Sequence, residues 1–274
     1  MKIINLMENT IGANNCLYEH GLSFYIETEH HKLLVDTGAS NAFLTNAETL
    51  GIDLTQVDTV ILSHGHYDHA GGILGFAELN SSAKIWMQKS AIDAYYHVND
   101  KLEKYIGIAP EIQKLPQVKW IEGNYRIDEE LFVFSGVTGR RLWPSGNLEL
   151  KVKQGDKFVQ DTFQHEQYLV MEEGDKRILI SGCAHNGILN ILEAYIDIYG
   201  TEPDIVISGF HMQKKDGYSE ADLEAVKETA RELVKYRTRF YTGHCTGEVP
   251  FRLLKDIMGE QLIYVHSGDE ICMD

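Results

Sequence analysis

The sequence predicts an α/β protein in which helices pack on the outside of one or two β-sheets. Three observations favour this fold class. Short apolar segments rich in β-branched and aromatic residues end at turn-forming residues, as strands do. In the second half of the chain these segments alternate with amphipathic segments of helical period. The chain of 274 residues, 43% of them hydrophobic, is long enough to bury a sizeable core.

The first third of the chain begins with strands and then adds helices. Five segments have the composition of strands, and they cover residues 2–7, 23–28, 32–38, 58–63 and 84–88. A helix is expected over 40–51, because Ser40 can cap its first turn and Gly51 can end it. A second helix is expected over 69–79, shortly after the fourth strand.

The middle of the chain has a weaker pattern. Aromatic and charged residues mix there, and the strands expected at 119–123 and 131–136 are short. We therefore expect a single domain over residues 1–274, with an insertion of mixed helices and strands at about 90–155.

Strands and helices alternate again in the last third. Strands are expected at 168–173, 177–182, 204–210 and 239–244, and helices at 186–200 and 219–236, before a last helix and strand. Ser219 can cap the longer helix. Its apolar residues fall on one face, as in a helix packed on a sheet: Leu223, Val226, Ala230, Leu233 and Val234.

Histidines follow several strand ends. His185, His211 and His244 each lie in a polar turn after a late strand, and strand ends are where the active sites of α/β proteins gather. Glu8 and Asn9, at the end of the first strand, could close another edge of the same pocket or simply cap that strand.

The segment LSHGHYDHAGG, residues 62–72, crowds His64, His66, Asp68 and His69 into six residues. Side chains of this kind cost desolvation and mutual repulsion when packed together, and a divalent metal ion is the common solution. His64 and His66 can point to one side, while Asp68 and His69 face a second point from the first turn of the next helix. Two hydrolytic metal ions ~3.5–4 Å apart need ligands divided in this way.

Composition excludes other classes of protein. The formal charge of −16 disfavours broad attraction to nucleic acid or to anionic membranes. Four cysteines at irregular spacing suggest neither a disulfide framework nor a zinc knuckle. The N-terminal segment lacks the apolar core of a signal peptide, and no run approaches the ~20 apolar residues of a membrane helix. We expect a cytoplasmic protein with a small-molecule substrate and no nucleic-acid or membrane partner, and the sequence predicts no oligomeric state.

The H-x-H-x-D-H motif after an apolar strand resembles the metallo-β-lactamase superfamily. The resemblance implies a four-layer αββα sandwich. The segments ILISGCAHNGILNI, ISGFHM, YTGHCTG, EHGLSFYIE and LLVDTG resemble one branch of it, the metal-dependent hydrolases related to 7,8-dihydropterin-6-methyl-4-(β-D-ribofuranosyl)aminobenzene-5′-phosphate synthase. This similarity covers most of the chain outside the insertion.

The resemblance implies two metal ions and assigns most of their ligands. His64 and His66 would bind the first ion, and Asp68, His69 and His244 the second. Zinc is our first choice from these donors, although manganese or iron would also accept them.

Either His185 or His165 would complete the first site. We favour His185, because GC-x-H is a signature of the branch, whereas the branch tends to carry an acidic residue at the position of His165; His165 would then contact substrate. Cys183 lies where relatives have a bridging aspartate or a cysteine ligand, so it is expected either to bind metal or to be a buried inert thiol. Asp36 would hold the metal-binding loop by hydrogen bonds.

Three further residues are candidates for substrate binding. His211 follows a strand at the same edge and would contact the substrate or transition state, with a packed histidine as the alternative. Lys214 and Lys215 precede a helix N-terminus and could hold a phosphate, with a charged surface loop as the alternative.

The expected activity is that of a binuclear metal-dependent hydrolase that uses a metal-bound hydroxide on a phosphate-containing or pterin-like small molecule. Asp68 and His211 are its expected catalytic residues, and Asp68 would orient the nucleophile. Two alternatives stay open: an oxidoreductase of the same fold with an iron site, and a non-catalytic binding or regulatory module.

Overall fold

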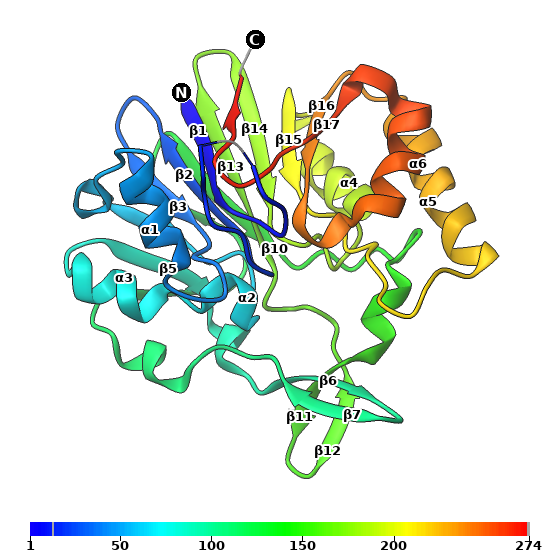
Figure 1. Ribbon diagram of the computed structural model, residues 1–274, viewed down its shortest axis with the longest axis horizontal. Coiled ribbons are helices and arrows are strands. Elements are labelled where there is room, and N and C mark those ends of the chain that lie inside the picture. Colours follow the sequence, from blue (N-terminus) through cyan, green and yellow to red (C-terminus); the bar gives the residue numbers. More distant parts are fainter. Residues whose placement is uncertain (13, 273–274) are drawn as a thin grey trace.

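In the computed structural model, which describes residues 1–12 and 14–272, two seven-stranded sheets pack face to face (Figure 1). The first sheet has the order β18-β1-β2-β3-β4-β5-β8. Its strands are β1 (Lys2–Met7), β2 (Ser23–Glu27), β3 (Lys32–Val35), β4 (Thr59–Ile61), β5 (Lys84–Gln88), β8 (Val118–Ile121) and β18 (Glu270–Ile271). The last strand pairs with the first one, with Ile271 opposite Ile3.

The second sheet has the order β17-β16-β15-β14-β13-β10-β9. Its strands are β9 (Tyr125–Arg126), β10 (Leu131–Ser135), β13 (Gln167–Glu173), β14 (Lys176–Ser181), β15 (Ile205–Ser208), β16 (Arg239–Thr242) and β17 (Leu262–Tyr264). The strands from β14 to β17 run parallel, so that their carboxyl ends reach one edge of the sandwich.

The helices form two outer layers on the sandwich (Figure 1). In the described part of the chain they are α1 (Ala42–Thr49), α2 (Tyr67–Ala70), α3 (Ile73–Leu79), α4 (Ile188–Tyr199), α5 (Glu220–Leu233) and α6 (Glu248–Met258). α1 and α3 cover the first sheet, and α4, α5 and α6 cover the second. Central strands are apolar on both faces because one face meets helices and the other meets the opposite sheet. The αββα sandwich is confirmed.

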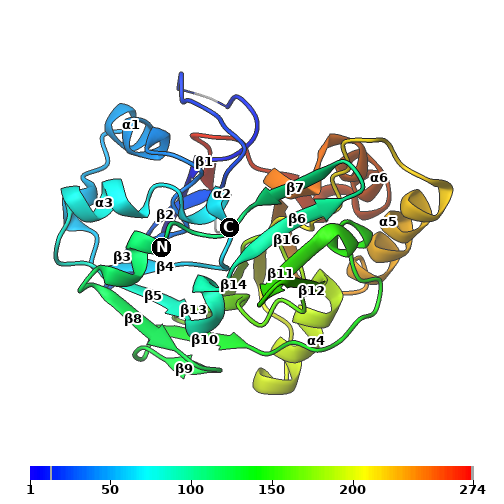
Figure 2. The same cartoon turned by 90° about the horizontal axis from the view of Figure 1, so that it is seen from below.

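A smaller sheet lies at one end of the sandwich, and Figure 2 looks onto that end. Its order among the described residues is β12-β11-β6-β7. It is made of β6 (Tyr95–Asn99), β7 (Leu102–Tyr105), β11 (Leu150–Gln154) and β12 (Lys157–Gln160). The expected insertion therefore contributes to three sheets, because β8 and β10 from the same part of the chain complete the two large ones.

Short 3-10 helices connect several elements: Leu54–Gln56, Lys89–Ile92, Pro110–Lys114, Ser145–Glu149, His244–Thr246 and Gly259–Gln261. No helix in the described ranges 1–12 and 14–272 is long and apolar enough to cross a membrane.

Three local expectations need correction. The helix expected over 69–79 is two helices, because Gly71 and Gly72 pass so close to the 37–43 segment that a Cβ on Gly71 would lie 2.1 Å from the Ala39 carbonyl oxygen. Ser40 does not cap α1 at the N-cap position, which Asn41 occupies. Val234 is the C-cap of α5 and is 41% exposed, so it lies outside the apolar face.

Candidate metal centre

The site residues come from strand ends at one edge of the sandwich. His64 and His66 follow β4, and Asp68 and His69 lie on α2. The parallel strands β14, β15 and β16 run into the segments that carry Cys183, His185, His211 and His244, which brings residues far apart in sequence to one place.

Several of these segments turn through left-handed backbone. Asp36, Ala184, His211 and His244 have φ values of 61°, 50°, 50° and 48°. This conformation costs non-glycine residues free energy, and it persists only where the surrounding structure enforces it, which is common at functional sites.

His64, His66 and His185 form the first donor group. Their ring centroids lie 4.6, 4.8 and 4.9 Å apart, and the Nε2 atoms of His64 and His185 are separated by 3.3 Å. His66 Nε2 is buried without a hydrogen-bond partner in the described chain. Burial, reinforced by His165, lowers the pKa of His66 to about 3, and burial also holds the pKa values of His64 and His185 well below the usual range. Three neutral imidazoles thus converge at one point.

The far sides of two of these rings are anchored. The Ser63 hydroxyl donates to Asp36, so it accepts from His64 Nδ1–H at 2.9 Å. Asn147 donates its amide to the His185 carbonyl oxygen, so its Oδ1 accepts from His185 Nδ1–H, also at 2.9 Å. Both histidines therefore carry the proton on Nδ1 and turn the lone pair of Nε2 inward.

Asp68, His69 and His244 form the second group. The Asp68 Oδ2 atom lies 3.8 Å from His69 Nε2 and 3.5 Å from His244 Nε2. Asp36, fully buried, accepts from His69 Nδ1 at 2.7 Å. Burial acts to lower the pKa of His69, but the Asp36 and Asp68 carboxylates outweigh it and raise that pKa to about 9. A positive charge on this side of the site is therefore favoured.

Cys183 lies between the two groups. Its Sγ is 3.2 Å from His69 Nε2. Donor atoms of His64, Cys183 and His185 all lie within 4.8 Å of one another, and the same holds for His69, Cys183 and His244. One thiol therefore belongs to both sets of donors.

His165 is close to the first group but differently engaged. Its Nδ1 accepts from the Gly65 N–H at 2.8 Å, and its Nε2 donates to Asp161 at 3.1 Å. Tyr95 covers the ring, with centroids 4.0 Å apart. Neither ring nitrogen of His165 retains a lone pair for a metal ion in this arrangement.

These residues fit a pair of divalent ions. The Nε2 atoms of His66 and His244 are buried, and neither has a hydrogen-bond partner among the described residues. Imidazole, carboxylate and thiol are the donors that zinc prefers, and a cation would relieve the repulsion of the inward lone pairs.

Comparison with known proteins identifies the family. The family model of the metallo-beta-lactamase superfamily matches residues 19–144. The crystal structure of Tm1679, described as a metal-dependent hydrolase of the beta-lactamase superfamily, is 30% identical, with a TM-score of 0.83, and the alignment covers 100% of this chain and 99% of that one. The chain belongs to the metallo-β-lactamase superfamily.

Two further proteins resemble the chain. The 7,8-dihydropterin-6-methyl-4-(beta-D-ribofuranosyl)-aminobenzene-5′-phosphate synthase of Methanocaldococcus jannaschii is 27% identical over 98% of this chain and 95% of its own length. Zn²⁺-bound PqqB from Methylobacterium extorquens is 13% identical with a TM-score of 0.59 over the whole of both chains, which is a likeness of fold alone. The predicted superfamily and its branch are confirmed by these similarities.

The remaining predicted residues of this superfamily member lie at different distances from the donors. The His211 ring is 4.1 Å from that of His185, and its Nδ1 is buried with no partner in residues 1–12 and 14–272. Lys214 is ion-paired to Asp222 at 2.6 Å, inside the capping box that Ser219 and Asp222 form at the start of α5. Lys215 is exposed. The Ser219 cap is thus confirmed, and among the described residues no hydrogen bond or ion pair joins Lys214 or Lys215 to the site histidines.

Two buried carboxylates anchor the superfamily site, and the sequence pointed to Glu8 but not to Glu166. Buried Glu166 accepts from the backbone N–H groups of His185 and Asn186, and burial raises its pKa. Buried Glu8, for which capping was the alternative, accepts from His244 N–H at 3.1 Å. A buried carboxylate next to a strand was the available signal, because such a group needs partners.

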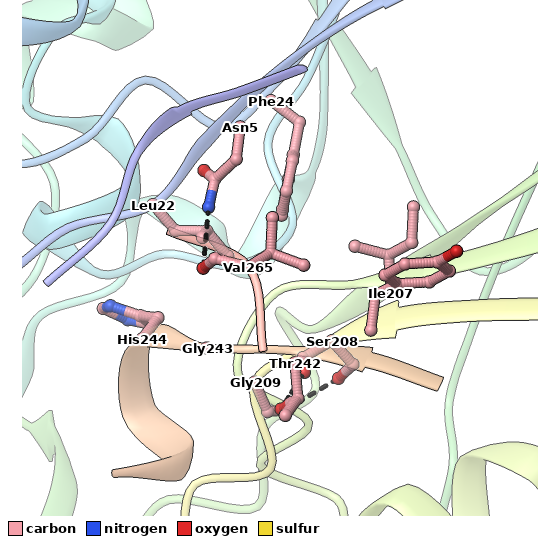
Figure 3. A pocket seen from close by; sticks show the side chains of 11 residues that line it. Asn5, Leu22, Phe24, Ile207, Ser208, Gly209, Thr242, Gly243, His244 and Val265 are labelled. Carbon is pink, nitrogen blue, oxygen red and sulfur yellow. Dashed lines mark hydrogen bonds between the residues drawn. The ribbon is translucent and has the colours of Figure 1, made fainter. Parts of the chain in front are cut away.

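Behind His244 the two sheets leave a small cavity of about 10 Å³ (Figure 3). Asn5 and Val265 close it with a hydrogen bond of 3.3 Å from the amide to the carbonyl oxygen. This void can hold about one water molecule at most, so it is too small for a substrate.

Proposed function

We propose that the chain is a binuclear metal-dependent hydrolase that acts on a small phosphorylated molecule. One observation carries the proposal: buried imidazoles with anchored Nδ1 atoms turn their Nε2 atoms toward two points that share the Cys183 thiol. Without cations at those points, several buried lone pairs would face one another at a cost of several kcal/mol.

The proposed ligands divide into two sets. His64, His66 and His185 would hold the first ion, and Asp68, His69 and His244 the second. Cys183 would lie between both. Zinc suits this mixture of nitrogen, oxygen and sulfur donors.

When bound, a pair of divalent ions supplies a water of lowered pKa and positive charge at the reacting group. The protein residues would do the rest. Asp68 offers a carboxylate oxygen that can accept a hydrogen bond from the attacking water. His211, next to His185, would contact the substrate. Asp36 keeps His69 in the required orientation through its Nδ1 hydrogen bond.

One observation supports a small phosphorylated substrate: the Methanocaldococcus relative is named for making a pterin-type phosphate. Because the formal charge of the chain is −16, an anionic substrate would need a local cationic centre, which two metal ions would supply. We also propose that residues 1–274 act as one catalytic domain, because Tyr95 of the small sheet and Asn147 beside it contact the site histidines.

The test combines metal analysis with a substrate screen. The purified chain is expected to bind two equivalents of zinc, and chelation should abolish turnover of the best substrate among phosphodiesters, phosphomonoesters, lactones and a pterin-type phosphate. His64→Ala and His66→Ala should each lose metal and activity, because each removes one of about three protein ligands. Full metal content and turnover in both variants would refute the assignment.

Cobalt substitution tests the thiol separately. Cobalt-loaded protein should show a thiolate-to-cobalt charge-transfer band that disappears in Cys183→Ala. Cys16→Ala, which removes another buried thiol, should keep the band. A band that survives in Cys183→Ala would show that Cys183 is an inert buried residue.

A further inference from the structure

His20 lies beside the second donor group and is unused by the ligand assignment. Its Nε2 is 3.3 Å from Asp68 Oδ2, and its ring stacks on that of His244, with centroids 5.2 Å apart. The side chain is 49% exposed, whereas that of His244 is fully buried. His20 therefore stands where solvent or a substrate reaches the second metal position.

The side-chain amide of Asn9 contacts both histidines, and backbone groups fix its orientation. Asn9 Oδ1 accepts from the Gly21 N–H at 3.3 Å, and Asn9 Nδ2 donates to the His244 carbonyl oxygen at 3.3 Å. The oxygen and nitrogen of the amide cannot be exchanged without breaking both bonds.

The fixed amide gives the two rings opposite tautomers. Asn9 Oδ1 lies 2.8 Å from His244 Nδ1, so this nitrogen carries the proton and His244 Nε2 keeps a lone pair. Asn9 Nδ2 donates to His20 Nδ1 at 3.2 Å, so that nitrogen holds the lone pair and His20 Nε2 carries the proton. His244 is thereby prepared to bind a metal ion, while His20 is prepared to donate a hydrogen bond.

We propose that His20 is a substrate-contacting residue whose Nε2–H donates a hydrogen bond to an anionic oxygen, such as that of a phosphate, held at the second metal position, and that Asn9 is the positioning residue that fixes its tautomer. The inference rests on the proposed metal assignment of Asp68 and His244. His20 would add an uncharged hydrogen-bond donor beside Asp68 and His244, which are proposed metal ligands. A hydrogen bond to a charged oxygen is stronger than one between two neutral groups.

The experiment uses the full-length zinc-loaded protein and inorganic phosphate as the probe. Calorimetric titration should show that His20→Ala weakens phosphate binding about tenfold or more while zinc content stays at the wild-type value. His20→Gln, whose amide N–H can replace the donor, should recover most of the affinity. His30→Ala, at an exposed histidine of the β2–β3 turn that pairs with Glu130, should bind phosphate as the wild type does.

A second readout reports the tautomer without any ligand. Nitrogen-15 NMR of the histidine rings should show His20 protonated at Nε2 in the wild type and a mixture of tautomers in Asn9→Ala. Loss of zinc in His20→Ala, protonation of His20 at Nδ1 in the wild type, or unchanged phosphate affinity in His20→Ala would each overturn the inference. Phosphate binding is measured without turnover, so failure of the hydrolase proposal appears separately, as a wild type that binds zinc and phosphate but cleaves no ester.

Discussion

At the scale of single residues, the site depends on neighbours that hold the Nδ1 side of several imidazoles. Asp36, Ser63 and Asn147 all act in this way, and each is buried. A buried anchor fixes both the tautomer and the direction of a ring, and loss of such an anchor typically lowers metal affinity 10- to 100-fold.

His185 and His165 should respond differently to truncation. His185→Ala is expected to lose close to one equivalent of zinc and most activity, because the first group has no spare imidazole. His165→Ala is expected to keep zinc but to lose about 1–3 kcal/mol of unfolding free energy, since it leaves the Gly65 N–H and the buried Asp161 carboxylate without their partner.

Zinc quantification and urea unfolding on both variants distinguish the two roles. Loss of zinc from the His165 variant together with retention in the His185 variant would reverse the assignment.

The sequence predicted part of this arrangement. The candidate donors on the 64–69 segment share one short motif, and Asp36 follows a recognisable strand. Asn147 could not be predicted as the partner of His185, because the two are 38 residues apart and meet only through the small sheet and its flanking turn. His20 and Asn9 were missed as a pair for the same reason: their contact depends on the path of the β1–β2 loop.

At the scale of elements, the small sheet supports the candidate metal centre from outside the sandwich. Tyr95 begins β6, is 3% exposed, and packs on His165 and His66. The sequence did not predict this sheet. Its two hairpins, 95–105 and 150–160, are marginal alone and stabilise each other only through the long-range β6–β11 pairing.

Tyr95→Ala should therefore weaken both the fold and the first metal position. We expect a loss of about 3–5 kcal/mol in unfolding free energy from the cavity, and weaker zinc binding measured by chelator competition. Tyr95→Phe removes only the hydrogen bond to the Ser90 carbonyl oxygen and should cost about 0.5–1.5 kcal/mol. Equal effects of the two variants would contradict a packing role for the ring.

The start of α5 offers a separate test. Ser219 accepts from the Asp222 N–H, and Asp222 returns the bond to the Ser219 backbone. Ser219→Ala should lower the unfolding free energy by about 1 kcal/mol without changing zinc content. Ser81→Ala, at an exposed loop serine, is the matched control and should have no measurable effect on unfolding. A zinc deficit in Ser219→Ala would show that this helix start contributes to the site.

At the scale of the whole molecule, one imidazole ties the two large sheets together. His31 precedes β3, and its Nδ1 lies 2.8 Å from Oδ1 of Asp58, which precedes β4 of the first sheet. Its Nε2 lies 2.8 Å from Oδ2 of Asp128, which precedes β10 of the second sheet. Burial acts to lower the pKa of His31, but its hydrogen bonds and charge interactions with Asp58 and Asp128 outweigh burial and raise that pKa.

This link predicts a pH dependence of stability. Because the folded pKa of His31 is above the unfolded value of about 6.5, its contribution is fully present below about pH 6.5 and is lost as the pH rises through the folded pKa. The ring is partly solvated, so we expect less than about 1 kcal/mol. Urea unfolding of chelator-treated wild type and His31→Gln at a series of pH values should show the difference shrinking toward alkaline pH. A difference that grows with pH would refute the link.

The order of the four layers could be predicted from the family resemblance, but the pairing of the last strand with the first could not. Hydrophobic patterning identifies strands without saying which distant strands pair, so nothing in β1 indicated that β18 would lie beside it.

That pairing has a consequence for how the protein is made. Strand β1 is synthesised long before β18, the strand that covers its edge, and Ser267, which bonds Glu8, is synthesised just before β18. His69 is likewise synthesised 175 residues before His244, roughly 9 to 35 seconds at about 5–20 residues per second. During that interval the nascent chain carries an open sheet edge and half of the proposed metal site, so chaperone protection and late metal loading are expected features of its biosynthesis.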